Sequence, residues 1–245
     1  MIQNRSIGIL VLTFNLVACF AQDIVPLPTK NSIKKFEIKS GLREVNIRLS
    51  NGDKWLALIS IPKKALNEEV HFVLALHWGV SANSYDDFMN CLMLPAIDTS
   101  KYIVMAPLAQ RQAWWANPKE KQLIRLLKLI SEYWPIDKII VSGYSDGGTG
   151  STYFAAKHPE YIDGAIAMAG NYLPATYKVP TYIIHGVRDE LFSYSKSKVV
   201  VEKNVKASEN VIFITSETLG HYQGCNYSSL LSDGFKWMEE TLNIN

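Results

Sequence analysis

Short stretches of alternating apolar and polar residues dominate the first part of the folded region. Three of them predict strands: KKFEIK at 34–39, EVNIRLS at 44–50 and KWLALISIP at 54–62. Alternation of this kind suits a strand that buries one face. The last two stretches flank Asn51-Gly52, a pair typical of tight hairpin turns. We therefore expect an antiparallel hairpin near the start of the fold.

Continuous apolar runs follow the hairpin along the rest of the chain. They occupy residues 71–78, 102–109, 138–144, 163–170, 179–186 and 210–217. Runs of this length suit strands buried on both faces of a parallel sheet. Helical patterns lie between or after them, the clearest beginning at Asn117-Pro118 and others near 147–157, 194–207 and 227–242.

This alternation predicts an α/β fold: a mostly parallel central sheet with an N-terminal antiparallel hairpin and helices on both faces. No segment is long enough to form a large lid, and none is rich enough in Pro, Gly or Ser to separate two domains. We therefore expect one domain over residues 22–245.

The N-terminal segment differs from the rest. Arg5 precedes an apolar run from Ile7 to Phe20, which is too short for a comfortable membrane span and suits a secretory signal over residues 1–21. A second interpretation is a lipobox ending at Cys19, which would leave a lipid anchor there. Both predict an exported protein, periplasmic or extracellular, and only lipidation at Cys19 would place it on a membrane.

Composition narrows the possible partners. The 245 residues carry a net charge of only +2, and there is no basic run, so nucleic acid is not an expected partner. If Cys19 leaves with the signal, Cys91 and Cys225 remain. Buried free thiols are the simpler interpretation of this pair, and a disulfide is the alternative.

The segment GYSDGG places Ser145 between the glycines at 143 and 147, after an apolar strand and before a helical pattern. Such a junction permits a sharp turn that forces a nucleophilic serine outward. The amide of Asp146, at the positive end of the helix, would then face charge that develops beside the serine. Ser145 is therefore the candidate nucleophile.

A serine nucleophile needs a base and an orienting acid from the ends of later strands. His221 follows the strand at 210–217 in a Gly-flanked loop and is the expected base, whereas His158 and His185 suit capping and loop-shaping roles. Asp189 follows the strand at 179–186 and is the expected acid, with Glu190 as its near rival.

These motifs resemble the α/β-hydrolase superfamily from about residue 35 onward. Gly143–Gly147 is similar to the nucleophile motif, His185-Gly186-x-x-Asp189 to the acid loop and Gly220-His221 to the base loop. In its GYSDGG motif and its lack of a lid insertion, the chain resembles polyhydroxybutyrate-depolymerase-like and feruloyl-esterase-like carboxylesterases. Prolyl-oligopeptidase-type domains share the same core pattern.

The resemblance implies hydrolysis of small or polymer-linked carboxylic esters through an acyl-enzyme, with no metal or organic cofactor. It also implies a second oxyanion amide from Gly79, with Trp78 as the rival donor, because His77 matches the oxyanion loop but Trp78 replaces its usual glycine. Trp78, Trp114 and Trp115 are the candidate substrate contacts. A serine peptidase or amidase and a non-catalytic binding protein are the alternative functions.

Overall fold

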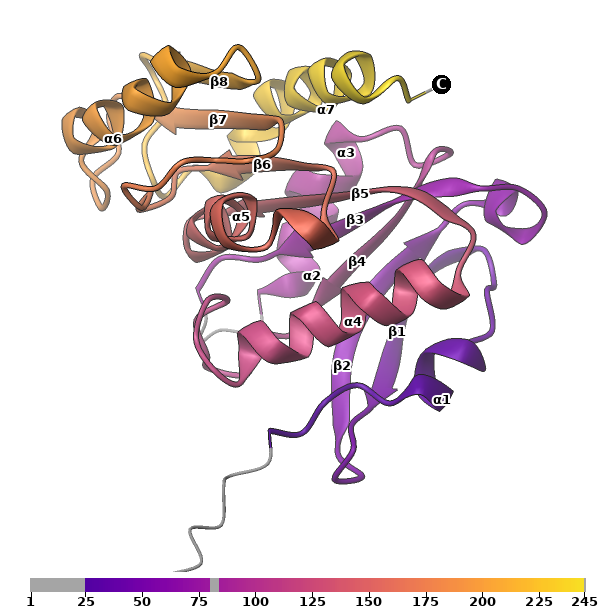
Figure 1. Ribbon diagram of the computed structural model, residues 1–245. Coiled ribbons are helices and arrows are strands. Elements are labelled where there is room, and N and C mark those ends of the chain that lie inside the picture. The colour runs from indigo at the N-terminus through magenta and orange to yellow at the C-terminus, as the bar shows by residue number, and fades with distance from the viewer. Residues whose placement is uncertain (1–24, 80–83, 245) are drawn as a thin grey trace, which may run out of the picture.

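The computed structural model describes residues 25–79 and 84–244. Eight strands form one mixed sheet in the order β1-β2-β4-β3-β5-β6-β7-β8 (Figure 1). Their bounds are β1 Gly41–Arg48, β2 Lys54–Ile61, β3 Val70–Leu76, β4 Tyr102–Pro107, β5 Ile136–Tyr144, β6 Gly164–Met168, β7 Thr181–Gly186 and β8 Val211–Ser216. The predicted fold class is confirmed.

The sheet is antiparallel only at its first end. β1 pairs with β2 across the predicted hairpin, and β2 pairs antiparallel with β4. Gly52 in the turn has φ +91°, a backbone angle that favours glycine. All the other strand pairs are parallel. The carboxyl ends of the parallel strands therefore meet at one edge, which is where such sheets bind ligands.

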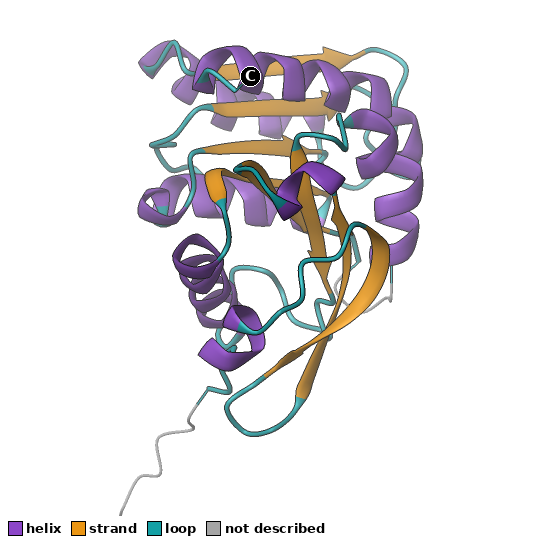
Figure 2. Ribbon diagram, turned by 90° about the vertical axis from the view of Figure 1, so that its right-hand side faces the viewer, coloured by secondary structure: helices purple, strands orange, loops and turns teal. Residues whose placement is uncertain are grey.

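Helices cover both faces of the sheet (Figure 2). The longer helices are α4 Lys119–Tyr133, α5 Asp146–Lys157, α6 Tyr194–Ala207 and α7 Ser228–Leu242. The shorter ones are α1 Lys30–Lys34, α2 Tyr85–Asp87, α3 Leu94–Ala96, a π-helical turn η2 at Phe88–Met93, and 3₁₀ turns η1 Lys63–Leu66, η3 Pro159–Tyr161 and η4 Gly224–Tyr227. One core joins α1, α4, α5 and α6 to one face, and a second joins η2, α3 and α7 to the other.

Two segments differ from the sequence expectation. The predicted strand at 34–39 is wrong, because the chain there leaves α1 without pairing to another strand. Phe36 and Ile38 still pack against the core, and Phe36 lies 5.1 Å from the ring of Trp134. Their alternation therefore reflects packing against the core rather than membership in the sheet. The second segment is the helical stretch at 85–96, which the apolar pattern did not reveal.

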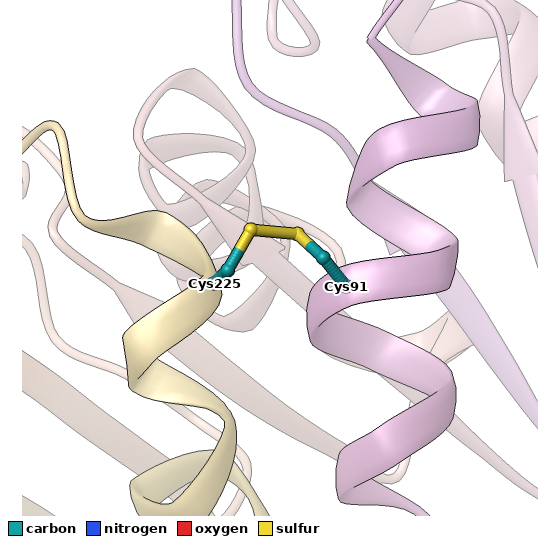
Figure 3. Close-up of a disulfide and its surroundings, with 2 residues drawn as sticks. All are labelled: Cys91 and Cys225. Atoms are coloured by element: carbon teal, nitrogen blue, oxygen red, sulfur yellow. A yellow bond between two sulfur atoms is a disulfide. The ribbon is translucent and has the colours of Figure 1, made fainter.

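A disulfide joins Cys91 on η2 to Cys225 on η4 (Figure 3). The two Cα atoms lie 5.2 Å apart although 134 residues separate them in sequence. The expectation of two free thiols is thus wrong. The sheet order brings both segments to the same face, a proximity that sequence spacing cannot reveal.

We expect replacement of Cys91 and Cys225 by serine to lower the free energy of unfolding by about 2–5 kcal/mol, because the bond closes a long loop in the unfolded chain. Urea unfolding of the oxidised protein and the double variant measures the change. A reducing agent should destabilise the wild-type protein to the level of the variant and leave the variant unaltered. Two titratable thiols in the unreduced, denatured wild-type protein would contradict the bond.

The predicted signal over residues 1–21 and the candidate lipidation site Cys19 lie outside the described residues. Within residues 25–79 and 84–244, no helix has both the length and the apolar character needed to cross a membrane.

Candidate active site

Ser145 lies at the junction of β5 and α5, the strand–turn–helix arrangement that the sequence predicts. Its backbone adopts φ 57° and ψ −117°, outside the regions that a non-glycine residue normally occupies. Its amide donates to the carbonyl of Met168, and its carbonyl accepts from the amide of Thr149 in α5. These bonds hold a strained turn of the kind that presents a reactive side chain.

The glycines around Ser145 are required by close backbone packing. A Cβ atom on Gly143 would lie 2.4 Å from the carbonyl of Gly147, and one on Gly147 would lie 1.7 Å from the carbonyl oxygen of Leu76. Gly148 is equally confined, because its Cβ would lie 2.3 Å from the carbonyl oxygen of Met168. The turn can therefore form only with glycine at these positions.

Ser145, His221 and Asp189 form a continuous hydrogen-bonded chain. Ser145 Oγ lies 2.9 Å from His221 Nε2, and His221 Nδ1 lies 2.8 Å from Asp189 Oδ2. The side chains of Asp189 and His221 are 0% and 6% exposed. Burial raises the pKa of Asp189, but hydrogen bonds from His221 and from the amides of Phe192 and Leu191 outweigh it, so the net pKa is lowered.

Hydrogen bonds outside the imidazole ring fix the backbone of His221. Its amide donates to Glu190 Oε2 over 2.6 Å, and its carbonyl accepts from Tyr144 Oη over 2.6 Å. The neighbouring amide of Gly220 donates to Gln223 Oε1 over 2.8 Å. Glu190, the rival acid, therefore binds the main chain of the base and not its ring. Sequence reasoning missed Tyr144 and Gln223, whose only signal was closeness to the serine and histidine motifs.

His185 lies behind the acid and shapes its loop, as the sequence predicts. Its Nε2 donates to the carbonyl of Phe192 over 2.9 Å and lies 3.7 Å from Asp189 Oδ2. Burial lowers the pKa of His185, so the ring is neutral at neutral pH. His158, by contrast, contacts Glu120 over 2.7 Å, away from this site.

The loop after β3 places Gly79 at the same pocket as Asp146, the first residue of α5. His77 supports this loop: its Nδ1 donates to the carbonyl of Trp78 over 2.7 Å, and its Nε2 accepts from the amide of Ala109 over 3.1 Å. Burial lowers the pKa of His77 to about 4, so its ring is neutral and keeps both bonds. The two candidate oxyanion residues thus flank Ser145 from different elements.

The buried amine of Lys119 binds the loop that follows β4. Lys119 is fully buried, donates to Gln110 Oε1 over 3.0 Å and lies 4.3 Å from the ring of Trp55. Its second acceptor, the carbonyl of Leu108 at 3.4 Å, also receives the indole N–H of Trp55. Burial lowers the pKa of Lys119 to about 7.

This pKa predicts a pH-dependent stability. Between about pH 7 and the ordinary lysine pKa near 10.4 the unfolded chain binds more protons at this site, so stability rises with pH by up to about 1.4 kcal/mol per unit. Replacement of Lys119 by methionine should flatten that rise and stabilise the protein most at pH 7. Urea unfolding at pH 7, 8 and 9 tests this. Parallel pH dependences in the two proteins would contradict it.

A pocket of about 580 Å³ opens in front of Ser145. Its lining residues are Trp78, Gly79, Tyr144, Ser145, Asp146, Leu191, His221, Tyr222, Gln223, Gly224, Cys225 and Asn226. Trp78 packs edge-on against Tyr144, which also lines the pocket, and against the buried Phe88 behind it. On the rim, Leu191 is 53% and Tyr222 is 78% exposed. The pocket thus combines the proposed nucleophile and base with the aromatic side chains of Trp78, Tyr144 and Tyr222.

The other two predicted substrate contacts do not line this pocket. Trp114 is 0% exposed, and its indole N–H donates to the carbonyl of His77 over 3.1 Å. It therefore supports the loop after β3 from the core, and its expected place in the cleft is corrected. Trp115 is half-buried and packs against the same core. Burial depth of a loop tryptophan depends on neighbours remote in sequence, which the local pattern does not specify.

The arrangement is suited to nucleophilic acyl transfer. A serine hydroxyl within hydrogen-bond distance of a histidine, itself oriented by a buried carboxylate, can transfer its proton as it attacks a carbonyl carbon. Among the described residues, no group of three or more His, Cys, Asp or Glu side chains is arranged to hold a metal ion.

No known family model and no curated protein sequence matches the chain. Solved structures do match its architecture. Fluorophosphonate-binding serine hydrolase F of Staphylococcus aureus aligns with a TM-score of 0.67 at 13% identity, over 82% of this chain and 98% of its own. The chain has the α/β-hydrolase fold. An S-formylglutathione hydrolase of the same organism aligns with a TM-score of 0.65 at 13% identity, over 81% and 96% of the two chains.

A third matching structure is a thermostable esterase, with a TM-score of 0.62 at 17% identity. The match covers 81% of this chain but 62% of that one, so this chain spans less than two thirds of the esterase's length. At identities this low, the structural similarity establishes the fold alone. The activity has to be argued from the residues of the site.

Proposed function

We propose that this protein is a serine hydrolase that cleaves carboxylic esters. The observation that carries the proposal is the hydrogen-bonded chain from Ser145 through His221 to Asp189, beside a pocket of about 580 Å³. The esterases and serine hydrolases among the solved structures of the same fold support it.

In the proposed reaction, Ser145 Oγ attacks the ester carbonyl carbon while His221 Nε2 accepts the hydroxyl proton. The amides of Gly79 and Asp146 donate to the oxyanion of the tetrahedral intermediate. The imidazolium of His221 then gives its proton to the departing alcohol, which leaves an acyl group on Ser145. Water, activated by the same histidine, releases the acid and restores the serine.

Asp189 has two tasks in this scheme. Its carboxylate accepts from His221 Nδ1, which leaves Nε2 free to receive the serine proton. Its negative charge also stabilises the imidazolium that forms at each step. The lowered pKa of Asp189 keeps the carboxylate ionised at neutral pH.

The decisive experiment follows hydrolysis of p-nitrophenyl acetate and butyrate by the chain from Gln22 onward, together with labelling by a fluorophosphonate probe. Ester turnover with stoichiometric labelling of Ser145 would support the proposal. Faster cleavage of matched peptide or amide substrates would favour the peptidase alternative. Absence of both turnover and labelling would favour a non-catalytic binding protein.

We also propose that the substrates resemble those of polyhydroxybutyrate-depolymerase-like and feruloyl-esterase-like enzymes. Turnover of hydroxyalkanoate oligomers or feruloyl esters, ranked by kcat/KM against simple alkyl esters, tests it. Equal or lower values for both classes would oppose it.

We further propose that the protein is exported. The apolar run from Ile7 to Phe20 and the Cys91–Cys225 disulfide both suit an oxidising compartment. Mass spectrometry of the mature N-terminus distinguishes cleavage before Gln22 from lipidation at Cys19, and retention of an intact N-terminus inside the cell would oppose export.

A further inference from the structure

The Cys91–Cys225 disulfide lies at the edge of the active-site pocket. Cys225 lines the pocket in front of Ser145, and only three residues separate it from His221 in sequence. Figure 3 shows the bond between η4 and η2, so the segment next to the proposed base is tied covalently to a second element. The bond therefore belongs to the surroundings of the reacting groups as well as to the fold.

The loop of His221 and η4 are joined by hydrogen bonds. Gln223 lies between them: its Oε1 accepts from the amide of Gly220 over 2.8 Å, and its carbonyl accepts from the amide of Asn226 over 2.8 Å. Gly220 directly precedes His221 in sequence. A displacement of η4 would therefore be passed to the main chain of the base.

The side chains of this segment are buried only at its two ends. His221 and Tyr227 are buried, whereas the five residues between them, 222–226, are exposed or half-buried. Among these five, Cys225 is the one with a covalent bond to another element. Exposed segments with few buried contacts open locally at a low free-energy cost. The disulfide thus supplies an attachment that the side chains of this segment do not.

The other end of the bond lies on a firmly packed element. The buried residues of η2 are each 0% exposed: Phe88, Met89, Leu92 and Met93. The ring of Phe88 also packs edge-on against Trp78, which lines the pocket. Through Cys91, the disulfide therefore fixes η4 relative to a support that also carries part of the pocket wall.

We infer that the Cys91–Cys225 disulfide positions His221 for the proposed reaction, and that its reduction lowers turnover while the fold is retained. The inference rests on the proposed esterase function and adds a means of regulating the same site. Cys225 is exposed at the pocket, which makes the bond accessible to a small dithiol. One thiolate of the dithiol attacks a sulfur atom and displaces the other cysteine as a thiolate. The second thiolate of the dithiol then releases the first cysteine and closes a cyclic disulfide, so the two cysteines gain two electrons and two protons.

The expected loss of rate is limited by the bonds that remain after reduction. A misplacement of about 1 Å in a catalytic group can cost on the order of 10²-fold in rate. Reduction leaves in place the hydrogen bonds that Glu190 and Tyr144 make with the main chain of His221. We therefore expect a smaller loss, with kcat lowered at least about fivefold. KM should change less than about threefold, because the residues that line the pocket stay the same.

Reduction with dithiothreitol, followed by its removal through gel filtration under argon, tests the inference. Titration should show two additional thiols per chain, and the circular dichroism spectrum should stay unchanged. The turnover of p-nitrophenyl butyrate and the rate at which a fluorophosphonate labels Ser145 should fall together, and reoxidation should restore both. The double variant Cys91→Ser/Cys225→Ser should match the reduced protein and should not respond to dithiothreitol.

The variant Leu126→Ala provides a control for lost stability alone. Leu126 is 0% exposed on α4, in the core on the opposite face of the sheet from η2. Its truncation leaves a cavity and destabilises the fold without touching the disulfide. Its kcat should therefore stay within about twofold of the wild-type value.

The outcomes separate this inference from the function on which it rests. If the oxidised protein hydrolyses the ester no faster than its Ser145→Ala variant, the proposed esterase function fails. If the oxidised protein is active and the fully reduced protein keeps the same kcat, the esterase function stands and the positioning role is overturned. Loss of the folded circular dichroism spectrum on reduction, or an equal loss of kcat in Leu126→Ala, would also overturn it, because the disulfide would then act through stability alone.

Discussion

Replacement of Ser145 by alanine is expected to reduce kcat for p-nitrophenyl butyrate on the order of 10⁶-fold, which leaves only the residual acceleration that binding and oxyanion stabilisation supply. The hydroxyl oxygen is the atom that bonds to the acyl carbon in the proposed reaction, and no neighbouring group can replace it. KM and the free energy of unfolding should change little by comparison. Steady-state kinetics and urea unfolding measure the two effects separately.

A matched control comes from the same segment. Ser142 lies three residues earlier in β5, is 0% exposed and has its hydroxyl 3.9 Å from Met93 Sδ, away from the pocket. The Ser142→Ala variant should keep its ester turnover within a few-fold of the wild-type value. If both variants retain equal turnover, the nucleophile has been assigned to the wrong residue.

Replacement of Asp189 by asparagine should lower kcat on the order of 10⁴-fold with the fold intact. An asparagine can turn its amide toward His221 Nδ1, which favours the tautomer with a proton on Nε2. That nitrogen then cannot accept the proton of Ser145. Kinetics at saturating ester, together with circular dichroism and the melting temperature, distinguish this chemical loss from unfolding.

Glu190 provides the isosteric comparison for the acid. Glutamine at this position keeps an oxygen that can accept from the His221 amide, so Glu190→Gln should reduce kcat less than tenfold. The ratio of the two losses decides which carboxylate orients the base. A larger loss in Glu190→Gln than in Asp189→Asn would contradict the present assignment.

Local sequence patterns determined the strand–turn–helix at Ser145 and most of the sheet. Apolar runs of strand length must be buried on both faces, and the glycines at 143 and 147 permit a turn that no other residue could form against Leu76. The rule that ligands lie beyond the carboxyl ends of parallel strands then placed Asp189 and His221 beside the serine. Their hydrogen-bonded contact is a structural observation that agrees with this expectation.

Two features of the structure could not be predicted from local sequence patterns. Alternation at 34–39 indicated a strand, but Phe36 and Ile38 pack against the core without pairing to another strand. Apolar periodicity reports which side chains are buried and not which backbone groups pair. Tyr144 gave no signal of its bond to the carbonyl of His221, because the two residues are 77 positions apart.

Only the tertiary structure decided the disulfide and the walls of the pocket. The sheet order carries η2 and η4 to the same face, so Cys91 and Cys225 meet across 134 residues. The same packing buries Trp114 under the loop after β3 and leaves Trp78 at the pocket. Burial and proximity of loop residues are set by whichever segments pack above and below them, and a single stretch of sequence does not contain that information.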